Sequence, residues 1–231
     1  MSKAPATDGR RKAAAARRRA REAEIIAATR ELFDSKGVRD VQIEEVATAV
    51  GINRAIVYRH FTGKEELFAL TLVGYLDELH DAMLSAADAA SSDEQVEAVV
   101  GAFADYGLAH PAFVDCAQAL MIRPGEELLE ELSEGALFRL GRGITSCLTI
   151  FSDCLAAGAE AGRYTLSEDA VLLANMLYAS GLGALQLARL GILVSEAAPG
   201  VPTVGQISAE QVRSYLVTSA LALVSPTRTS A

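Results

Sequence analysis

Residues 51–67, GINRAIVYRHFTGKEEL, hold the clearest local signals for the fold of this chain. Gly51 ends a short preceding helix, Ile43 to Val50, which keeps its apolar residues on one face. Asn53 is a good cap for the next helix, which we expect to reach about Phe61. Two short helices joined by a tight glycine turn predict a helix-turn-helix.

The second helix of this pair would lie in the major groove, leading with its N-terminal residues. Val57 and Phe61 lie four residues apart, so one face packs inward and the polar side chains stay outside. Asn and Arg can pair with adenine and guanine edges, while Tyr, His, Lys and the start of the following helix can bind phosphates. The residues that we expect to face DNA are Asn53, Arg54, Tyr58, His60 and Lys64.

The charge is divided unevenly along the chain. The 231 residues carry a net charge of −9, but residues 1–64 hold 14 Lys+Arg against 8 Asp+Glu, a balance of +6. Residues 65–231 hold 7 Arg, no Lys and 22 Asp+Glu, a balance of −15. We call the basic part, residues 1–64, the head and the acidic remainder the body. A basic head on an acidic body indicates a polyanion-binding module joined to a part with a different role.

Composition and periodicity divide the chain into three parts. Residues 1–16 are rich in Ala, Lys and Arg, and we expect a disordered basic tail that either contacts DNA or only adds solubilising charge. Residues 17–66 form the helix-turn-helix domain, and residues 67–225 form a second helical domain. Few prolines and abundant Ala, Leu and Glu predict an all-α protein of about nine helices. No strand pattern is convincing, and the segment from Ser195 to Gly205 is typical of a loop.

Two stretches resemble the DNA-binding domain of TetR-family transcriptional regulators: IIAATRELFDSKG, residues 25–37, and IEEVATAVGINRAIVYRHFTGKEEL, residues 43–67. The likeness includes the spacing from Leu-Phe to Gly and on to Tyr-x-His-Phe and Lys. The remaining helices are similar to the family only in layout. The resemblance implies a homodimer that binds a palindromic DNA operator. It also implies a helical C-terminal domain whose small-molecule effector changes the spacing of the two heads.

The resemblance also implies roles for single residues. The positions that match base-reading residues are Arg54, Ala55 and Tyr58, and those that match phosphate contacts are Asn53, His60, Thr62 and Lys64. Gln42 stands where the family usually has Ser or Thr as a helix cap, so the cap is weaker, although Gln42 can still donate to a phosphate. Ile56 replaces a common Thr and removes one phosphate hydrogen bond.

Two helices near the C-terminus, Ser167 to Val194 and Ser208 to Val224, are apolar on more than one face. Such helices must be buried on several sides, and two copies of the pair could form a four-helix dimer interface. Packing within a single chain is the alternative.

A ligand pocket would lie among the helices between Ser91 and Gly162, with Tyr178 opposite. Its candidate residues are Phe103, Tyr106, Phe113, Leu120, Met121, Arg123, Phe138, Arg139, Arg142, Ile144, Leu148 and Phe151. Together they predict an apolar or amphipathic ligand, such as a fatty-acyl or drug-like compound. Taken singly, each of these residues is better explained as simple core, and a neutral or cationic ligand fits the acidic domain as well.

The remaining features favour a cytoplasmic protein that is not an enzyme. Three cysteines without a CxxC pair fit a reduced compartment, and a redox role for Cys147 and Cys154 is the alternative. No signal peptide is apparent, and the apolar stretch from Ala170 to Val194 is interrupted by polar residues. No HExxH, Walker or GxSxG motif occurs. His80 with two nearby aspartates forms a solvated face more readily than a metal site, so we expect no metal and no cofactor.

The sequence therefore predicts a transcriptional repressor that a small apolar ligand releases from DNA. A ligand-dependent activator or a co-repressed regulator of the same fold is one alternative. A helical lipid- or drug-binding protein with a non-functional helix-turn-helix is the other.

Overall fold

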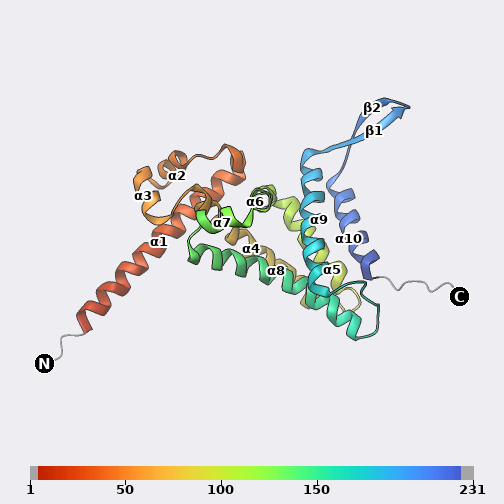
Figure 1. Ribbon diagram of the computed structural model, residues 1–231, viewed down its shortest axis with the longest axis horizontal. Helices are drawn as coiled ribbons and strands as arrows, with labels where there is room; N and C mark the ends of the chain where they lie inside the picture. Colours follow the sequence, from red (N-terminus) through yellow and green to blue (C-terminus); the bar gives the residue numbers. More distant parts are fainter. Residues whose placement is uncertain (1–4, 225–231) are drawn as a thin grey trace.

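Ten α-helices, one short 3-10 helix and one β-hairpin make up the part of the chain that the structure describes (Figure 1). The computed structural model describes residues 5–224, with side chains from residue 9 onward. The helices are α1 (Pro5–Lys36), η1 (Val38–Asp40), α2 (Ile43–Val50), α3 (Arg54–His60), α4 (Lys64–Ala89), α5 (Gln95–Ala109), α6 (Pro111–Met121), α7 (Gly125–Glu131), α8 (Glu134–Glu160), α9 (Ala170–Leu190) and α10 (Ala209–Val224). The strands are β1 (Ile192–Ala198) and β2 (Val201–Gln206). The predicted all-α class and N-terminal helix-turn-helix are confirmed, with ten α-helices in the described residues in place of about nine.

α2 and α3 form the helix-turn-helix. Gly51 stands between them with φ 71°, in the left-handed region that favours glycine. The Asn53 side chain accepts a hydrogen bond from the N–H of Ile56 at 3.1 Å, which caps α3 as predicted. The apolar residues that hold the two helices against α1 and α4 are Ile43, Val46, Ala47, Val57 and Phe61, all buried.

α1 is longer than the sequence predicts, because it begins at Pro5 and runs for 32 residues. The prediction of a disordered tail over residues 1–16 is therefore wrong for residues 5–16, while residues 1–4 lie outside the described part. Ala and Arg are strong helix formers, and a helix already anchored in the head extends without a new nucleation step. Residues 9–20 are exposed, and the extension projects beyond the head (Figure 1).

α4 runs from the head into the centre of the body, where it packs against α5 and α8 (Figure 1). Its buried residues include Leu72, Leu76, Leu79 and Met83, which lie on one face at helical spacing. Since the head ends where α4 begins, the packing of the body fixes the direction in which the head is presented.

The segment predicted as a loop, Ser195 to Gly205, lies in an antiparallel β-hairpin instead. β-branched residues such as Val194 and Val204, which face each other in the register, favour strands. Gly200, with φ 78°, suits the turn between the strands. Pro202 is tolerated because each strand of a two-stranded sheet has an open edge.

α9 ends earlier than predicted, at Leu190 rather than about Val194, because Gly191 takes a left-handed conformation and caps it. α10 begins after Ser208, whose hydroxyl accepts from the N–H of Gln211 at 3.1 Å. The Gln211 side chain accepts in return from the N–H of Ser208 at 2.8 Å, so the predicted cap is a reciprocal one.

Candidate DNA-binding and effector sites

One side of α3 is open to solvent and carries the predicted base-reading residues. Arg54, Ala55 and Tyr58 are all exposed, and the Arg54 guanidinium carbon lies 5.5 Å from the centre of the Tyr58 ring. Arg54 also pairs with Glu44 of α2, Nη1 to Oε1, at 2.7 Å. This exposed pair is weak and can be exchanged for a stronger contact to a base edge or a phosphate.

Asn53 and Gln42 lie at the N-termini of the two helices. The side-chain carbonyl oxygen of Asn53 accepts the hydrogen bond that caps α3, so only the side-chain amide N–H groups remain to donate to DNA. The N–H of Gln42 donates to the Glu45 carboxylate at 2.9 Å, which secures the start of α2 without a Ser or Thr. Hydrogen bonds from Lys36 and then from Gln42 lower the pKa of Glu45.

His60 does not lie outside, contrary to the prediction. Its side chain is 14% exposed, and Nδ1 lies 3.4 Å from the Glu22 carboxylate of α1. The reason is helical geometry, because His60 follows the buried Val57 by three residues and shares its face of α3. His60 therefore joins α3 to α1, and its role as a DNA contact remains a prediction.

Thr62 and Lys64 flank the turn into α4. The Thr62 hydroxyl donates to the carbonyl oxygen of Glu131 at 2.9 Å, a contact between the head and α7. The Lys64 ammonium lies 4.9 Å from the centre of the Phe68 ring, at cation–π distance. Gly63 is the N-cap of α4, so the first turn of that helix presents free N–H groups beside both side chains.

Glu66 holds this turn in place from below. Its side chain accepts hydrogen bonds from the N–H of Thr62 and from the hydroxyl of Ser133, the residue that caps α8. Burial alone would raise the pKa of Glu66, but the hydrogen bonds from Ser133 and Thr62 outweigh it and lower the pKa. The carboxylate therefore stays ionised and links the end of the helix-turn-helix to the body.

The extension of α1 adds a second basic surface. Residues 9–20 hold no acidic residue, and six of their twelve side chains are exposed Lys or Arg: Arg10, Arg11, Lys12, Arg17, Arg18 and Arg19. Within this stretch Arg18 pairs with Glu22 at the edge of the head. A charged helix that packs on nothing is marginally stable alone, and a polyanion would stabilise it.

A polar network fastens α1 to the body on the other side. Arg30 donates to both carboxylate oxygens of Glu78, with Nη2 to Oε2 at 2.5 Å, and the Tyr106 hydroxyl donates to the same carboxylate at 3.0 Å. The Tyr75 hydroxyl donates to Asp34 at 2.7 Å. The bond from Arg30 lowers the pKa of Glu78 against the effect of burial.

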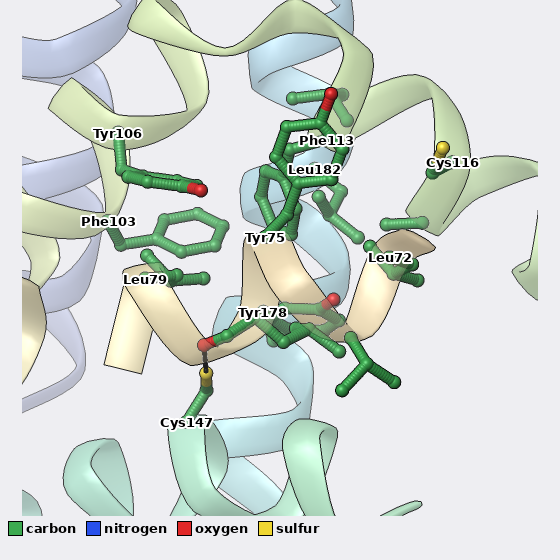
Figure 2. Close-up of a cluster of buried hydrophobic side chains, with 14 of the residues drawn as sticks. Leu72, Tyr75, Leu79, Phe103, Tyr106, Phe113, Cys116, Cys147, Tyr178 and Leu182 are labelled. Atoms are coloured by element: carbon green, nitrogen blue, oxygen red, sulfur yellow. Dashed lines mark hydrogen bonds between the residues drawn. The ribbon is translucent and has the colours of Figure 1, made fainter. Parts of the chain in front are cut away.

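Five of the predicted ligand residues lie in the core, where Figure 2 shows most of them. Phe103 packs against Phe151 and Tyr178, with ring centres 5.7 and 5.9 Å apart, and Tyr106 packs against Phe113 at 5.6 Å. All five are buried. These side chains therefore belong to the core, as the alternative interpretation predicts. A ligand could bind among them only if the rings moved apart.

Four other predicted residues lie on the outside of the body. Phe138 is 71% exposed and Arg142 is exposed beside it on α8, where they line an open depression. Leu148 is half-buried on the same helix, and Met121 is 54% exposed at the end of α6. These residues are not brought together with the aromatic cluster.

Two more, Arg139 and Ile144, lie on α8, where Arg139 is exposed and Ile144 is half-buried. The remaining two, Leu120 and Arg123, line a cavity of about 250 Å³ between the head and the body, which we call the junction cavity. Its other lining residues are Val38, Arg39, Lys64, Glu65, Phe68, Cys116 and Ala119, from η1, α4 and α6. Arg123 pairs with Glu131 of α7 and lies 3.7 Å from Glu65. Leu120 and Arg123 are predicted as pocket residues, but no local pattern indicates the cavity itself, since its walls come from segments far apart in the chain.

A third surface is apolar and lies opposite the head (Figure 1). We call it the α9–α10 face, and it includes the hairpin. No charged residue occurs from Ala170 to Ala188. Its exposed large side chains are Val171, Leu172, Met176, Leu190, Ile192, Leu193, Val194, Val201, Val204, Tyr215 and Leu223. An exposed apolar surface of this extent indicates an interaction site.

The described side chains offer no group of three or more His, Cys, Asp or Glu that could hold a metal ion. The three cysteines are free and buried, and burial raises the pKa of each thiol, to about 12 for Cys147. Thiols in this state react slowly. α9 is long and apolar enough to cross a membrane, but an interface or core helix of a soluble protein meets the same criterion.

Residues 25–71 match the family of bacterial regulatory proteins named tetR. The match spans both helices of the helix-turn-helix and the first part of α4. An 87-residue stretch is also 29% identical to the HTH-type transcriptional activator FasR of Mycolicibacterium smegmatis, over 37% of this chain. The aligned stretch spans only 40% of the length of that relative.

Two solved structures share the fold over most of the chain. RolR, in complex with resorcinol, is 18% identical with a TM-score of 0.65, over 92% of this chain and 91% of its own. FadR from Bacillus subtilis, in complex with stearoyl-CoA, is 12% identical with a TM-score of 0.61, over 87% of this chain and 98% of its own. At these identities the likeness establishes the fold of the body as well as of the head.

Proposed function

We propose that this chain, whose residues 25–71 match the tetR family, is a transcriptional regulator rather than an enzyme and represses transcription as a homodimer on a palindromic operator. A small apolar or amphipathic ligand releases it from DNA. The observation that carries the proposal is the surface formed by the open side of α3 and the turn into α4. It presents Arg54, Tyr58 and Lys64 on a head of net positive charge.

The residues that we assign to DNA divide into two groups. Arg54, Ala55 and Tyr58 read base edges, because they lie on the exposed side of α3. Gln42, Asn53, His60, Thr62 and Lys64 contact phosphates, and His60 does so only if it leaves Glu22. The α1 extension adds phosphate contacts outside the major groove.

The α9–α10 face supports the homodimer. An apolar surface with no charge from Ala170 to Ala188 fits another surface of the same kind, and a two-fold axis brings the same surface of a second copy against it. The hairpin strengthens the argument, because two isolated strands are marginal in water. With seven residues in β1, the hairpin extends roughly 20 Å, about two helix diameters, so it can lie across a helix of the partner.

The effector is proposed from the apolar character of the body. Two proteins of the same fold were solved with resorcinol and with stearoyl-CoA, which supports a small aromatic or acyl ligand here. The sign of regulation is proposed from the resemblance alone. The FasR relative is named an activator, so ligand-dependent activation is the second candidate. A regulator that binds operator DNA acts in the cytoplasm, which is therefore the proposed location.

Selection of binding sites from random DNA tests this proposal. The full-length protein should enrich a sequence with two symmetric half-sites whose centres lie one or more helical turns apart. The Arg54→Ala variant should enrich a sequence that has lost information at one position in each half-site. Enrichment of no sequence, or of single half-sites alone, would contradict the operator and homodimer proposals respectively.

A further inference from the structure

The junction cavity combines an apolar interior with a charged rim. Phe68, Leu120 and the buried Cys116 supply the apolar part. Because one water occupies about 30 Å³, a volume of about 250 Å³ admits a molecule of roughly ten non-hydrogen atoms. The site is thus large enough for a single ring or a short branched chain and too small for a long acyl chain.

The rim is cationic. It carries three cationic side chains, Arg39, Lys64 and Arg123, and one carboxylate, Glu65, so its net charge is +2. Glu131 lies just beyond the rim and lowers the net charge to +1. Arg123 is engaged with both carboxylates. Within residues 9–224, however, neither Arg39 nor Lys64 forms an ion pair with a carboxylate. Two uncompensated cations beside an apolar hollow match a ligand that carries one negative charge.

We propose that the junction cavity binds a compact aromatic or branched-chain carboxylate. The apolar group packs against Phe68 and Leu120, and the carboxylate faces Arg39 and Lys64. The site itself stands on the cavity and its charges, while its regulatory consequence rests on the proposed function.

The proposed effect on DNA binding follows from Lys64, because the same side chain contacts both the ligand and the DNA. A ligand shifts an equilibrium only through different affinities for the two states. When Lys64 binds a phosphate its charge is neutralised, so a carboxylate in the cavity binds the DNA-free protein more tightly. The cavity also lies between η1 of the head and α6 of the body, so a bound molecule contacts both parts.

Calorimetric titration of the full-length protein with benzoate tests the site without DNA. Wild type should bind benzoate with a dissociation constant on the order of 1 mM or below, a value attainable by so small a ligand. Benzyl alcohol, a neutral analogue of similar size, should bind at least tenfold more weakly.

Three variants locate the binding. Ala119→Phe fills the cavity from an exposed position on α6, and Arg39→Gln removes a rim charge, so both should weaken benzoate binding at least tenfold. Ile122→Phe is the matched control, because Ile122 follows α6, is 83% exposed and does not line the cavity. Absence of benzoate binding to wild type, equal binding of benzyl alcohol, or full binding to Ala119→Phe would overturn the proposal.

DNA enters in a separate measurement. Benzoate should lower the affinity of wild type for its selected DNA site and should not do so for Ala119→Phe. If benzoate binds in the calorimeter but leaves DNA affinity unchanged, the regulatory part of the proposal is overturned. A protein that binds no DNA sequence refutes the proposed function instead, and the calorimetric result still decides the site.

Discussion

The helix-turn-helix surface and the α9–α10 face are both left open by the single chain, and they differ in every chemical respect. Around α3 and along the α1 extension the exposed residues are polar and mostly basic. Across α9 and the hairpin they are apolar, with no charge from Ala170 to Ala188. This difference supports the two partners that we propose: a polyanion for the first surface and a second copy of the chain for the other.

α4 connects the two surfaces. Its first turn carries Lys64 and Glu66 beside the helix-turn-helix, and its later turns form the centre of the body. The polar network of Arg30 and Glu78 and the bond between Glu66 and Ser133 fasten the head to this body at two points. A change in the body therefore has two physical routes to the DNA-binding surface.

The largest effect should come from a charge on the apolar surface. Met176→Glu places a carboxylate in each copy of the α9–α10 face, and burying these unpaired charges should raise the dimer dissociation constant roughly 100-fold or more. Analytical ultracentrifugation measures the change. Ala157→Glu, on the exposed side of α8, is the control and should leave the dimer dissociation constant unchanged. An unchanged dimer in Met176→Glu would place the interface elsewhere.

Arg54→Ala should have the next largest effect. It should cost about 1–3 kcal/mol of binding to the preferred DNA site and relax the preference at one position in each half-site. Thermal unfolding should hardly change, because the ion pair of Arg54 with Glu44 is exposed and contributes little to stability. Competition binding with matched and mismatched duplexes separates the two effects. Equal losses on specific and random DNA would rule out base reading by Arg54.

Glu66→Gln should act on stability and not on specificity. Removing the ionised acceptor of the Thr62 and Ser133 hydrogen bonds should lower the free energy of unfolding by about 1–3 kcal/mol at neutral pH. The folded pKa of Glu66 lies below the ordinary value of 4.5, so its contribution is complete above that pH and is lost as the pH falls through the folded pKa. Urea denaturation at several pH values should show the difference from wild type shrinking below pH 4.5. A difference that stays constant would contradict the linkage.

The smallest effect is expected from Lys64→Ala. It should weaken binding to all DNA sequences about equally and flatten the dependence of log affinity on log salt by about 1, since one phosphate contact is lost. Titrations at several salt concentrations measure the slope. Glu97, exposed on α5 in the body, gives a matched control, because Glu97→Ala should leave the slope as it is.

The head could be predicted closely from the sequence because its signals are local. Gly51 and the Asn53 cap fix the turn within a few residues, and the apolar spacing of Val57 and Phe61 sets the buried face. His60 was misplaced because it shares the side of Val57, and its contact with Glu22 of α1 is distant in sequence.

The body was predicted less well because its features depend on segments distant in sequence. An aromatic side chain such as Phe103 has the same pattern whether it lines a pocket or fills the core, and only the packing decides. No strand is predicted in the hairpin because Pro202 and Gly205 disfavour a strand locally. Pairing between β1 and β2, which no local pattern shows, stabilises both strands. The junction cavity needs Arg39 from the head and Leu120 from the body, which no local pattern joins.

The most direct test compares the affinity of the full-length protein for the selected palindrome with its affinity for a single half-site on DNA of equal length. If the α9–α10 face pairs two heads on one operator, wild type should bind the palindrome at least 100-fold more tightly, and Met176→Glu should lose most of that difference. Equal affinity of wild type for the two DNAs would contradict the account, because the head would then act without the partner that the apolar face is proposed to bring.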